Sequence, residues 1–276
     1  MGNSPISTLR RPVRGTAQPL LAGARYALSV SSAPEDVEAA QRLRYTVFST
    51  EPGFDGSMDR AVDGRDTDRF DDHCDHVVVR HIPTDEVVGC YRMLPPPGAI
   101  AAGGLYTATE FDLSALEPIA AETVEMGRAC VAPAHRSGAV MSLMWSGILR
   151  YLDLAGYRFV VGCTSVPVDP ADGTPPAAVV RAVRDLVLAR HRAPWEVHPL
   201  RPVVIDGRTL DDIAPAVGTP TPPLLSGYLR IGAQICGEPA HDPDFGVADF
   251  VTVLDTTRAN IRYLDRLRSA ADAAQA

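Results

Sequence analysis

The feature that most constrains this chain is a strand, a long helix and a second strand that follow one another between residues 122 and 164. Residues 138–155 place apolar side chains at helical spacing along one side. Residues 159–164 form an apolar run, which is typical of a strand buried in the middle of a sheet. We therefore expect a sheet with helices packed on it.

The other segments extend this sheet. We expect further strands at 26–30, 76–81, 87–94, 203–205, around 228–235 and at 250–254, and further helices at 34–48, 177–192 and 257–271. A Pro/Gly/Ala connection is expected at 95–104. This order favours one mixed α/β domain over residues 25–276, with helices on both faces, after a flexible N-terminal tail at 1–24.

Charge and composition exclude several classes of protein. The net charge is −8 and all basic residues are arginines, so we expect no nucleic-acid partner, no Schiff-base lysine and no Walker-type phosphate loop. Five cysteines lack any C-x-x-C pair, which argues against zinc and disulfide frameworks. No apolar run is long enough to span a membrane. We expect a cytoplasmic protein.

The stretch from residue 63 to residue 75 is rich in aspartate. A metal site is the weakest interpretation, because the spacing matches no calcium loop, and we predict no bound metal. A solvated acidic loop and a substrate-side cluster paired with arginines both remain open. Asp66, Asp68 and Asp71 are the candidate members of such a cluster.

Arginines in apolar surroundings supply the opposite charge. Arg92 and Arg128 lie in otherwise apolar strands, where a guanidinium needs a carboxylate partner. Glu125 and Arg128 are three residues apart and would face opposite sides of a regular strand. A bulge at Met126-Gly127 would bring them together. The pattern predicts a polar centre built on strands.

The turn before the long helix carries Arg136 and Gly138. The N–H groups and the dipole of a helix N-terminus attract anions, so this turn is a candidate phosphate loop. From the turn alone, an ordinary glycine-containing connection is an equal alternative.

Taken in order, RLRYTVF (42–48), the aspartate-rich loop, VVGCYRML (87–94) and VEMGRACV (124–131) resemble the GNAT superfamily and follow the order seen in acyl-homoserine-lactone synthases. The blocks DRFDDHCDHVVV, EMGRACVAPAHR, LMWSG and PPLLSGYLRIGAQICGEPAHDPDFGVADFVTVL are more similar to ornithine N-acyltransferases, which make lyso-ornithine lipid. The resemblance covers residues 26 to about 265. It implies a GNAT-like, mostly antiparallel mixed sheet flanked by helices, with a C-terminal extension.

The resemblance also implies an activity: transfer of a fatty acyl group, with or without a 3-hydroxyl, from a phosphopantetheine thioester to the amine of a small amino acid such as ornithine. The donor would be acyl-carrier protein or acyl-CoA, with no permanently bound cofactor. Peripheral association with the inner face of the membrane stays open, and the sequence indicates no oligomeric state. An acetyl-CoA-dependent small-molecule acetyltransferase, a catalytically silent acyl-binding member and a Cys74 nucleophile are the alternatives.

Each candidate residue has an expected role. The catalytic candidates are Glu125 as first choice of base, Asp71 as second, and Arg92 and Arg128, which would fix either the substrate carboxylate or the acidic cluster. The resemblance adds Arg44, Asp66 and Asp68 on the amine side, and Arg136, Ser137, Gly138, Ala139 and Val140 around the phosphopantetheine arm. We expect the acyl chain to contact Met141, Met144, Trp145, Ile148, Phe159 and Val161. We expect a carrier protein to dock on Arg181 and Arg184 or at His135-Arg136.

Overall fold

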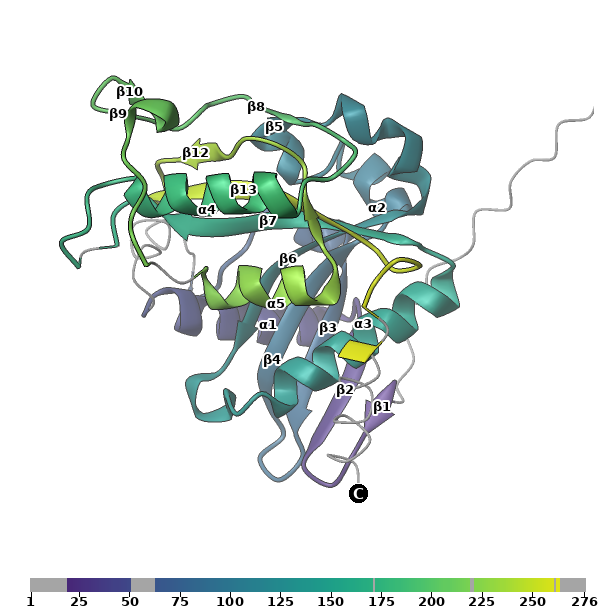
Figure 1. Ribbon diagram of the computed structural model, residues 1–276. Helices are drawn as coiled ribbons and strands as arrows, with labels where there is room; N and C mark the ends of the chain where they lie inside the picture. The colour runs from purple at the N-terminus through teal and green to yellow at the C-terminus, as the bar shows by residue number, and fades with distance from the viewer. Residues whose placement is uncertain (1–18, 51–62, 171, 219–220, 261, 264–276) are drawn as a thin grey trace, which may run out of the picture.

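The computed structural model describes residues 19–50, 63–170, 172–218, 221–260 and 262–263. The main strands are β1 (Leu21–Ala22), β2 (Tyr26–Ser31), β3 (Asp75–His81), β4 (Glu86–Leu94), β6 (Thr123–Val131), β7 (Phe159–Pro167), β11 (Gln234–Ile235), β12 (Ala240–Asp242) and β13 (Val247–Asp255). Within the described residues they form one sheet in the order β1-β2-β3-β4-β6-β7-β13-β11, with β12 beside β13 (Figure 1).

The sheet is mixed but mostly antiparallel, as the resemblance implied. The pairing of β6 with β7 is parallel, and every other neighbouring pair of the described strands is antiparallel. Two short ribbons lie outside it, formed by β5 (Phe111–Asp112) with β8 (His198–Pro199) and by β9 (Val204–Ile205) with β10 (Arg208–Thr209). The predicted central position of residues 159–164 is confirmed, because β7 lies between β6 and β13.

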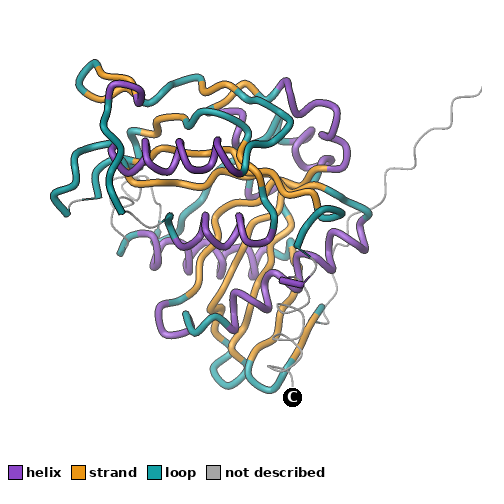
Figure 2. The backbone as a smooth tube through the Cα atoms, viewed as in Figure 1, coloured by secondary structure: helices purple, strands orange, loops and turns teal. Residues whose placement is uncertain are grey.

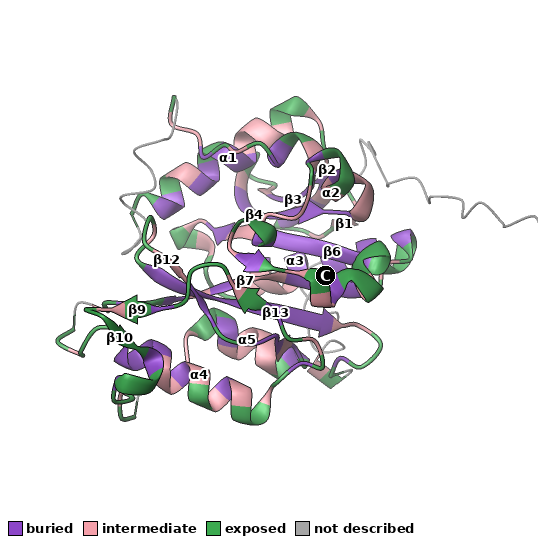
Figure 3. Cartoon of the chain, turned by 90° about the horizontal axis from the view of Figure 1, so that it is seen from above, coloured by how far each residue is buried: buried purple, intermediate pink, exposed green. Residues whose placement is uncertain are grey.

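Helices cover both faces of the sheet, as expected (Figures 2 and 3). They are α1 (Pro34–Phe48), α2 (Pro96–Ala101), α3 (Ala139–Ala155), α4 (Ala178–Arg190) and α5 (Pro223–Ile231). Cys90 of β4 packs under α1, whereas the next residue, Tyr91, packs in the cluster under α3. Successive side chains of a strand point to opposite faces, so α1 and α3 lie on opposite sides. Helices α4 and α5 share one apolar cluster with Phe250 of β13.

The expected helices at 34–48, 138–155 and 177–192 are confirmed as α1, α3 and α4. Proline at the start of α1 has the fixed φ that suits a first helical turn, and Glu35 and Asp36 lie near the positive end of its dipole. Helix α3 begins after Gly138, which has a positive φ of 93°, and ends at Gly156, which is left-handed. Both are backbone positions that glycine occupies without strain.

Three expectations are corrected. Of the strand predicted around 228–235, residues 228–231 belong to helix α5, and only Gln234 and Ile235 pair with β13. The Pro/Gly/Ala connection contains helix α2. Residues 257–260, where a C-terminal helix was predicted to begin, form a turn; residues 262 and 263 are helical, and most of that predicted helix lies outside the described residues. So does most of the predicted N-terminal tail, although Leu21 and Ala22 pair with β2.

No helix of the described residues combines the length and the apolar character that crossing a membrane requires.

Candidate active site

Strands β6 and β7 pair for only a short distance before they separate. Their parallel pairing covers residues 123–125 of β6 and residues 159–161 of β7. On the other side of β6, the register with β4 shifts between Cys90 and Arg92, and Arg128 has a positive φ of 54°. A cavity of about 310 Å³ opens here. Its polar lining includes Arg92, Tyr106, Thr107, Glu125, Arg128, Cys163, Ser165, Asp242 and Asp249.

The predicted bulge exists, but it lies two residues further along β6 than expected, at Arg128 and Ala129. Cys90 pairs with Cys130 and Arg92 with Gly127, so Arg128 and its neighbour both lie opposite Tyr91. The irregularity brings Glu125 and Arg128 to the same cavity, as predicted. Within the described residues, however, the ion pairs of Arg128 go to aspartates and not to Glu125.

Three arginines and three aspartates form a buried cluster on the α1 side of the sheet. This arginine–aspartate cluster consists of Arg44, Arg92, Arg128, Asp66, Asp68 and Asp71. Arg44 donates to both carboxylate oxygens of Asp71, at 3.0 and 2.7 Å. Its Nε lies 2.9 Å from Asp66 Oδ2. Arg92 Nη1 lies 2.6 Å from Asp68 Oδ1 and 3.0 Å from Asp71 Oδ1.

The cluster balances its own charges. Burial opposes ionisation of Asp71, but the hydrogen bonds and charges of Arg44 and Arg92 hold the pKa of that carboxyl far below its ordinary value. Arg128 reaches the same loop, with Nε 3.4 Å from Asp66 Oδ2 and Nη2 3.5 Å from Asp68 Oδ2. Arg92 and Arg128 were expected to fix either the substrate carboxylate or the acidic cluster. Their contacts are those of residues that hold the acidic cluster.

Glu125 stands apart from this cluster. Its side chain is 5% exposed and lines the cavity at the point where β6 leaves β7. Oε1 accepts hydrogen bonds from Thr107 N at 2.8 Å and Thr107 Oγ1 at 2.6 Å, and Oε2 accepts one from Tyr106 N at 2.7 Å. Burial raises the pKa of Glu125 above its ordinary value, although these hydrogen bonds act in the opposite direction.

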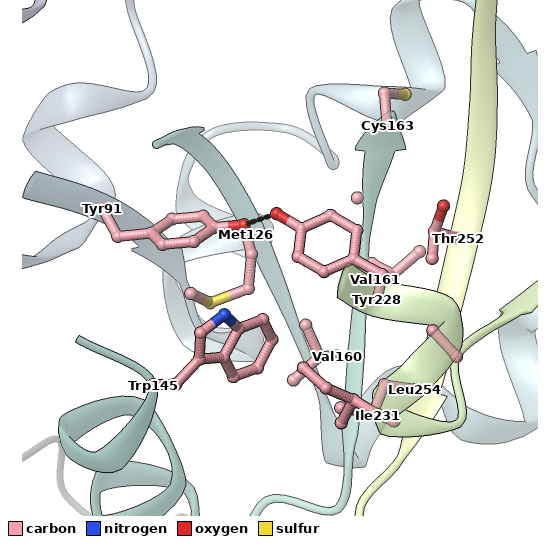
Figure 4. Close-up of a pocket in the computed structure, with 12 residues that line it drawn as sticks. Tyr91, Met126, Trp145, Val160, Val161, Cys163, Tyr228, Ile231, Thr252 and Leu254 are labelled. Atoms are coloured by element: carbon pink, nitrogen blue, oxygen red, sulfur yellow. Dashed lines mark hydrogen bonds between the residues drawn. The ribbon is translucent and has the colours of Figure 1, made fainter. Parts of the chain in front are cut away.

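An apolar pocket adjoins the cavity and is shown in Figure 4. Tyr91 and Tyr228 line both spaces, and their hydroxyl groups form a hydrogen bond with each other. Trp145 of α3 packs edge-on to Tyr228, with ring centroids 5.8 Å apart. Of the residues expected along the acyl chain, Trp145 and Val161 line this pocket. The others lie elsewhere: Met144 and Ile148 in the core, Met141 at a third cavity and Phe159 against Trp195.

The predicted phosphate loop borders that third cavity, of about 220 Å³. Arg136, Gly138 and Met141 line it together with the end of β6. Arg136 Nε donates to the carbonyl oxygen of Val131 at 3.0 Å, which fixes the turn against the strand. Ala139 is the first residue of α3 and Val140 is buried beneath it, so the α3 N-terminus begins at this cavity.

Over most of its length the chain is similar to proteins of known activity. A family profile described as an acetyltransferase (GNAT) domain matches residues 43–146. The chain is 34% identical over 239 residues to the L-ornithine N(alpha)-acyltransferase of Brucella abortus (strain 2308), a match that covers 83% of each chain. It is 31% identical over 244 residues to the enzyme of the same name from Rhizobium meliloti (strain 1021), covering 83% of this chain and 80% of that one. The chain belongs to the L-ornithine N(alpha)-acyltransferase family.

Membership of this family makes the chain an acyltransferase. Among solved structures, a CoA-dependent acyl-homoserine lactone synthase with SAM and isopentyl-CoA is 16% identical, with a TM-score of 0.47, over 87% of this chain and 83% of the other.

Sequence reasoning missed one group in this acyltransferase: Glu110, Asp242 and Asp249, whose carboxylate oxygens lie within 4.8 Å of one another. Of the described residues, these three also have the spacing needed to hold a metal ion. They come from three separate segments, so no local pattern connects them. The signal available was Asp249 itself, a carboxylate inside the apolar strand β13.

Gly162 of β7 allows the close approach of the two strands. A β-carbon at this position would collide with the carbonyl oxygen of Met126 on β6, a backbone atom that cannot turn aside. Gly162→Ala is therefore expected to push the strands apart and to lower the free energy of unfolding by about 1–3 kcal/mol, measured by urea denaturation. Gly127→Ala on β6 is the control, because its β-carbon would meet nothing within 4 Å. Equal stability of the two variants would contradict this account.

Proposed function

We propose that this acyltransferase moves a fatty acyl group from a phosphopantetheine thioester to the α-amine of ornithine or a similar small amino acid. The observation that carries the proposal is the Glu125 carboxyl, buried yet lining the cavity at the separation of β6 and β7. The names of the relatives support ornithine as the acceptor.

The chemistry needs a neutral amine and an activated carbonyl. A thioester is already activated, so the amine nitrogen attacks the carbonyl carbon directly, the N–C bond forms and the C–S bond breaks. Glu125 accepts the proton that the amine loses, and the departing sulfur leaves as a thiol once protonated. A base held close to the amine contributes about 10²–10⁴-fold to such a step.

A cysteine nucleophile has no support from the site. Cys74 is 4% exposed, and burial raises the pKa of its thiol to about 12. Cys163 lines the cavity, but burial raises the pKa of that thiol too, well above its ordinary value. A thiol in such surroundings is seldom the reactive thiolate.

Asp71 is a poorer candidate base than Glu125. Its carboxylate is held by Arg44 and Arg92 and has a strongly lowered pKa, so it has little tendency to take a proton. We assign it, with Asp66 and Asp68, the task of positioning the 63–75 loop against β4 and β6. Backbone N–H groups of the separated part of β6 would stabilise the oxyanion.

The remaining two spaces support a binding site for the donor. The turn from Arg136 to Val140 would receive the phosphate of the pantetheine arm at the α3 N-terminus. The acyl chain would enter the apolar pocket between Trp145 and Tyr228 (Figure 4). Opening the Tyr91–Tyr228 hydrogen bond would join this pocket to the main cavity.

An acyl-carrier protein would dock near His135 and Arg136 and not on α4. Arg181 already pairs with Asp185, and Arg184 with Asp211 and Glu238. These ion pairs neutralise the α4 surface that the sequence suggested for an acidic carrier.

Thiol release tests the proposal. Long-chain acyl-carrier protein and long-chain acyl-CoA are each incubated with ornithine, and free thiol and acylated product are measured. We expect ornithine to accelerate release from at least one donor. Acetyl-CoA as the preferred donor, or no acceleration by any amino acid, would refute the proposed function.

A further inference from the structure

The cavity has a second acidic wall opposite the arginine–aspartate cluster. It is formed by Glu110, which follows Thr109, by Asp242 at the end of β12 and by Asp249 in β13. Asp242 and Asp249 line the same cavity as Glu125 and Arg128. Asp242 and Asp249 therefore face the space in which the proposed acceptor reacts, and a carboxylate oxygen of Glu110 lies within 4.8 Å of theirs.

These carboxylates lack a cationic partner. Asp249 is 5% exposed; its Oδ1 accepts a hydrogen bond from Ser165 Oγ at 2.6 Å, and its carboxyl is hydrogen-bonded to that of Glu110. Glu110 Oε2 is buried and receives no hydrogen bond from N–H or hydroxyl donors of the described residues. Within the part of the chain that the structure describes, no arginine or histidine forms an ion pair with Glu110, Asp242 or Asp249.

The arginine whose charge acts on Glu110 and Asp249 forms its ion pairs elsewhere. Arg128 pairs with Asp66 and Asp68, and its guanidinium carbon lies 5.3 Å from the ring centre of Tyr106 and 5.9 Å from that of Phe245. A buried carboxylate without a partner is costly, and proteins avoid it except where a ligand supplies the charge. Within the described residues, the charge of this group is therefore balanced by a shared proton or by a cation that binds in the cavity.

We propose that Glu110, Asp242 and Asp249 bind the ammonium group at the end of the acceptor's side chain, so that the enzyme selects a diamino acid. This inference rests on the proposed function, because it places the α-amine at Glu125 in the same cavity. An ammonium group has three N–H donors, and the three carboxyls, whose oxygens lie within 4.8 Å of one another, can accept them once the proton shared by Glu110 and Asp249 has left.

The raised pKa values of Glu110 and Asp249 agree with binding of an ammonium group by these carboxyls. Burial, together with the charges of Asp249 and Asp242, raises the pKa of Glu110. Burial also raises the pKa of Asp249, against the hydrogen bond from Ser165 and the charge of Arg128. The hydrogen bond between Glu110 and Asp249 accordingly shares a proton between the two carboxyls, and a bound ammonium would take its place.

The test compares ornithine with norvaline, which has the same carbon chain but no side-chain ammonium. In the unaltered enzyme kcat/KM for ornithine is expected to exceed that for norvaline by about 10²-fold or more, since losing a buried ionic partner costs several kcal/mol. In the double variant Glu110→Gln/Asp249→Asn this ratio is expected to fall at least about tenfold, chiefly through a higher KM for ornithine. Glu117→Gln, an exposed carboxyl, is the matched control and should keep the original ratio.

Calorimetric binding of each amino acid to the protein without donor provides a second readout. If ornithine binds more tightly than norvaline and the double variant loses this difference, the ammonium site is supported. That support holds even if no amine accelerates thiol release, because the failure of thiol release would refute the proposed function alone. An unchanged ratio and unchanged binding in a folded double variant would overturn the inference. So would ornithine binding or turnover that is abolished by EDTA and restored by Ca²⁺ or Mn²⁺, which would make the wall a metal site.

Discussion

Replacement of Glu125 by glutamine is expected to lower turnover with ornithine by about 10²–10⁴-fold, the range for loss of a positioned general base. Glutamine keeps the shape of the side chain, and its carbonyl oxygen can still accept the two hydrogen bonds from Thr107, whereas the bond from Tyr106 N to Oε2 is lost. The buried position favours a neutral group, since burial already raises the pKa of Glu125. Folding should therefore survive while proton transfer is lost.

The pH profile distinguishes a base from a merely structural carboxylate. Glu125 must be ionised to accept a proton, so kcat/KM should rise with pH through a pKa above the ordinary value of 4.5. The variant should lose this dependence but retain the rise that belongs to the amine itself, near about 7.7–8.0. Glu122→Gln, an exposed carboxyl just before β6, is the control. Full turnover in folded Glu125→Gln would transfer the role of base to another group or to water.

The sequence predicted those parts of the fold whose signal is local. Residues 159–164 are apolar without interruption, and they occupy the sheet centre because only a strand covered on both faces can bury them. Helix α5 was missed because Tyr228 and Ile231 are residue types common in strands, although the spacing of Leu225, Tyr228 and Ile231 is that of a helix. The correct signals were Pro223 in the first turn and Gly232 after the last, where the backbone is left-handed.

The two sets of acidic residues at the cavity also differ in whether their sequence signal is local. Asp66, Asp68 and Asp71 lie in one short loop. Arg92 lies in an apolar strand and needs carboxylate partners there, which predicts that this loop packs against the strand. Glu110, Asp242 and Asp249 meet only after the β12–β13 hairpin folds against β7. No sequence pattern predicts a contact between such distant residues. For this reason these three carboxylates, to which we assign acceptor selection, were identified only from the structure.

The arginine–aspartate cluster leads to the largest expected change in stability. Arg44 is 1% exposed, and its loss in Arg44→Met would leave Asp71, which is 3% exposed, with a buried charge that Arg92 alone must balance. Breaking a buried ion pair by removing one partner costs about 3–5 kcal/mol, because the remaining charge stays desolvated. We expect a loss of this size in the free energy of unfolding, measured by urea denaturation at neutral pH.

A neighbouring arginine supplies the control for this measurement. Arg42 pairs with Glu38 at 2.7 Å on the exposed side of α1, where both side chains are about half exposed. Such a pair contributes about 0.3–0.5 kcal/mol, so Arg42→Met should change stability little. A cost for Arg44→Met no greater than that for Arg42→Met would show that the cluster does not stabilise the fold.

The dependence of this loss on pH identifies Asp71 as its source. The pKa of Asp71 is lowered in the folded protein, so its contribution is present above the ordinary pKa of 3.8 and is lost as pH falls through the folded value. In Arg44→Met the carboxyl can take up a proton earlier, which removes the unbalanced charge. The stability difference between the two proteins should therefore narrow as pH falls below 3.8, and Arg44→Met/Asp71→Asn should recover part of it at neutral pH. A difference that stays constant with pH, with no recovery in the double variant, would assign the loss to the packing of the Arg44 side chain and not to its charge.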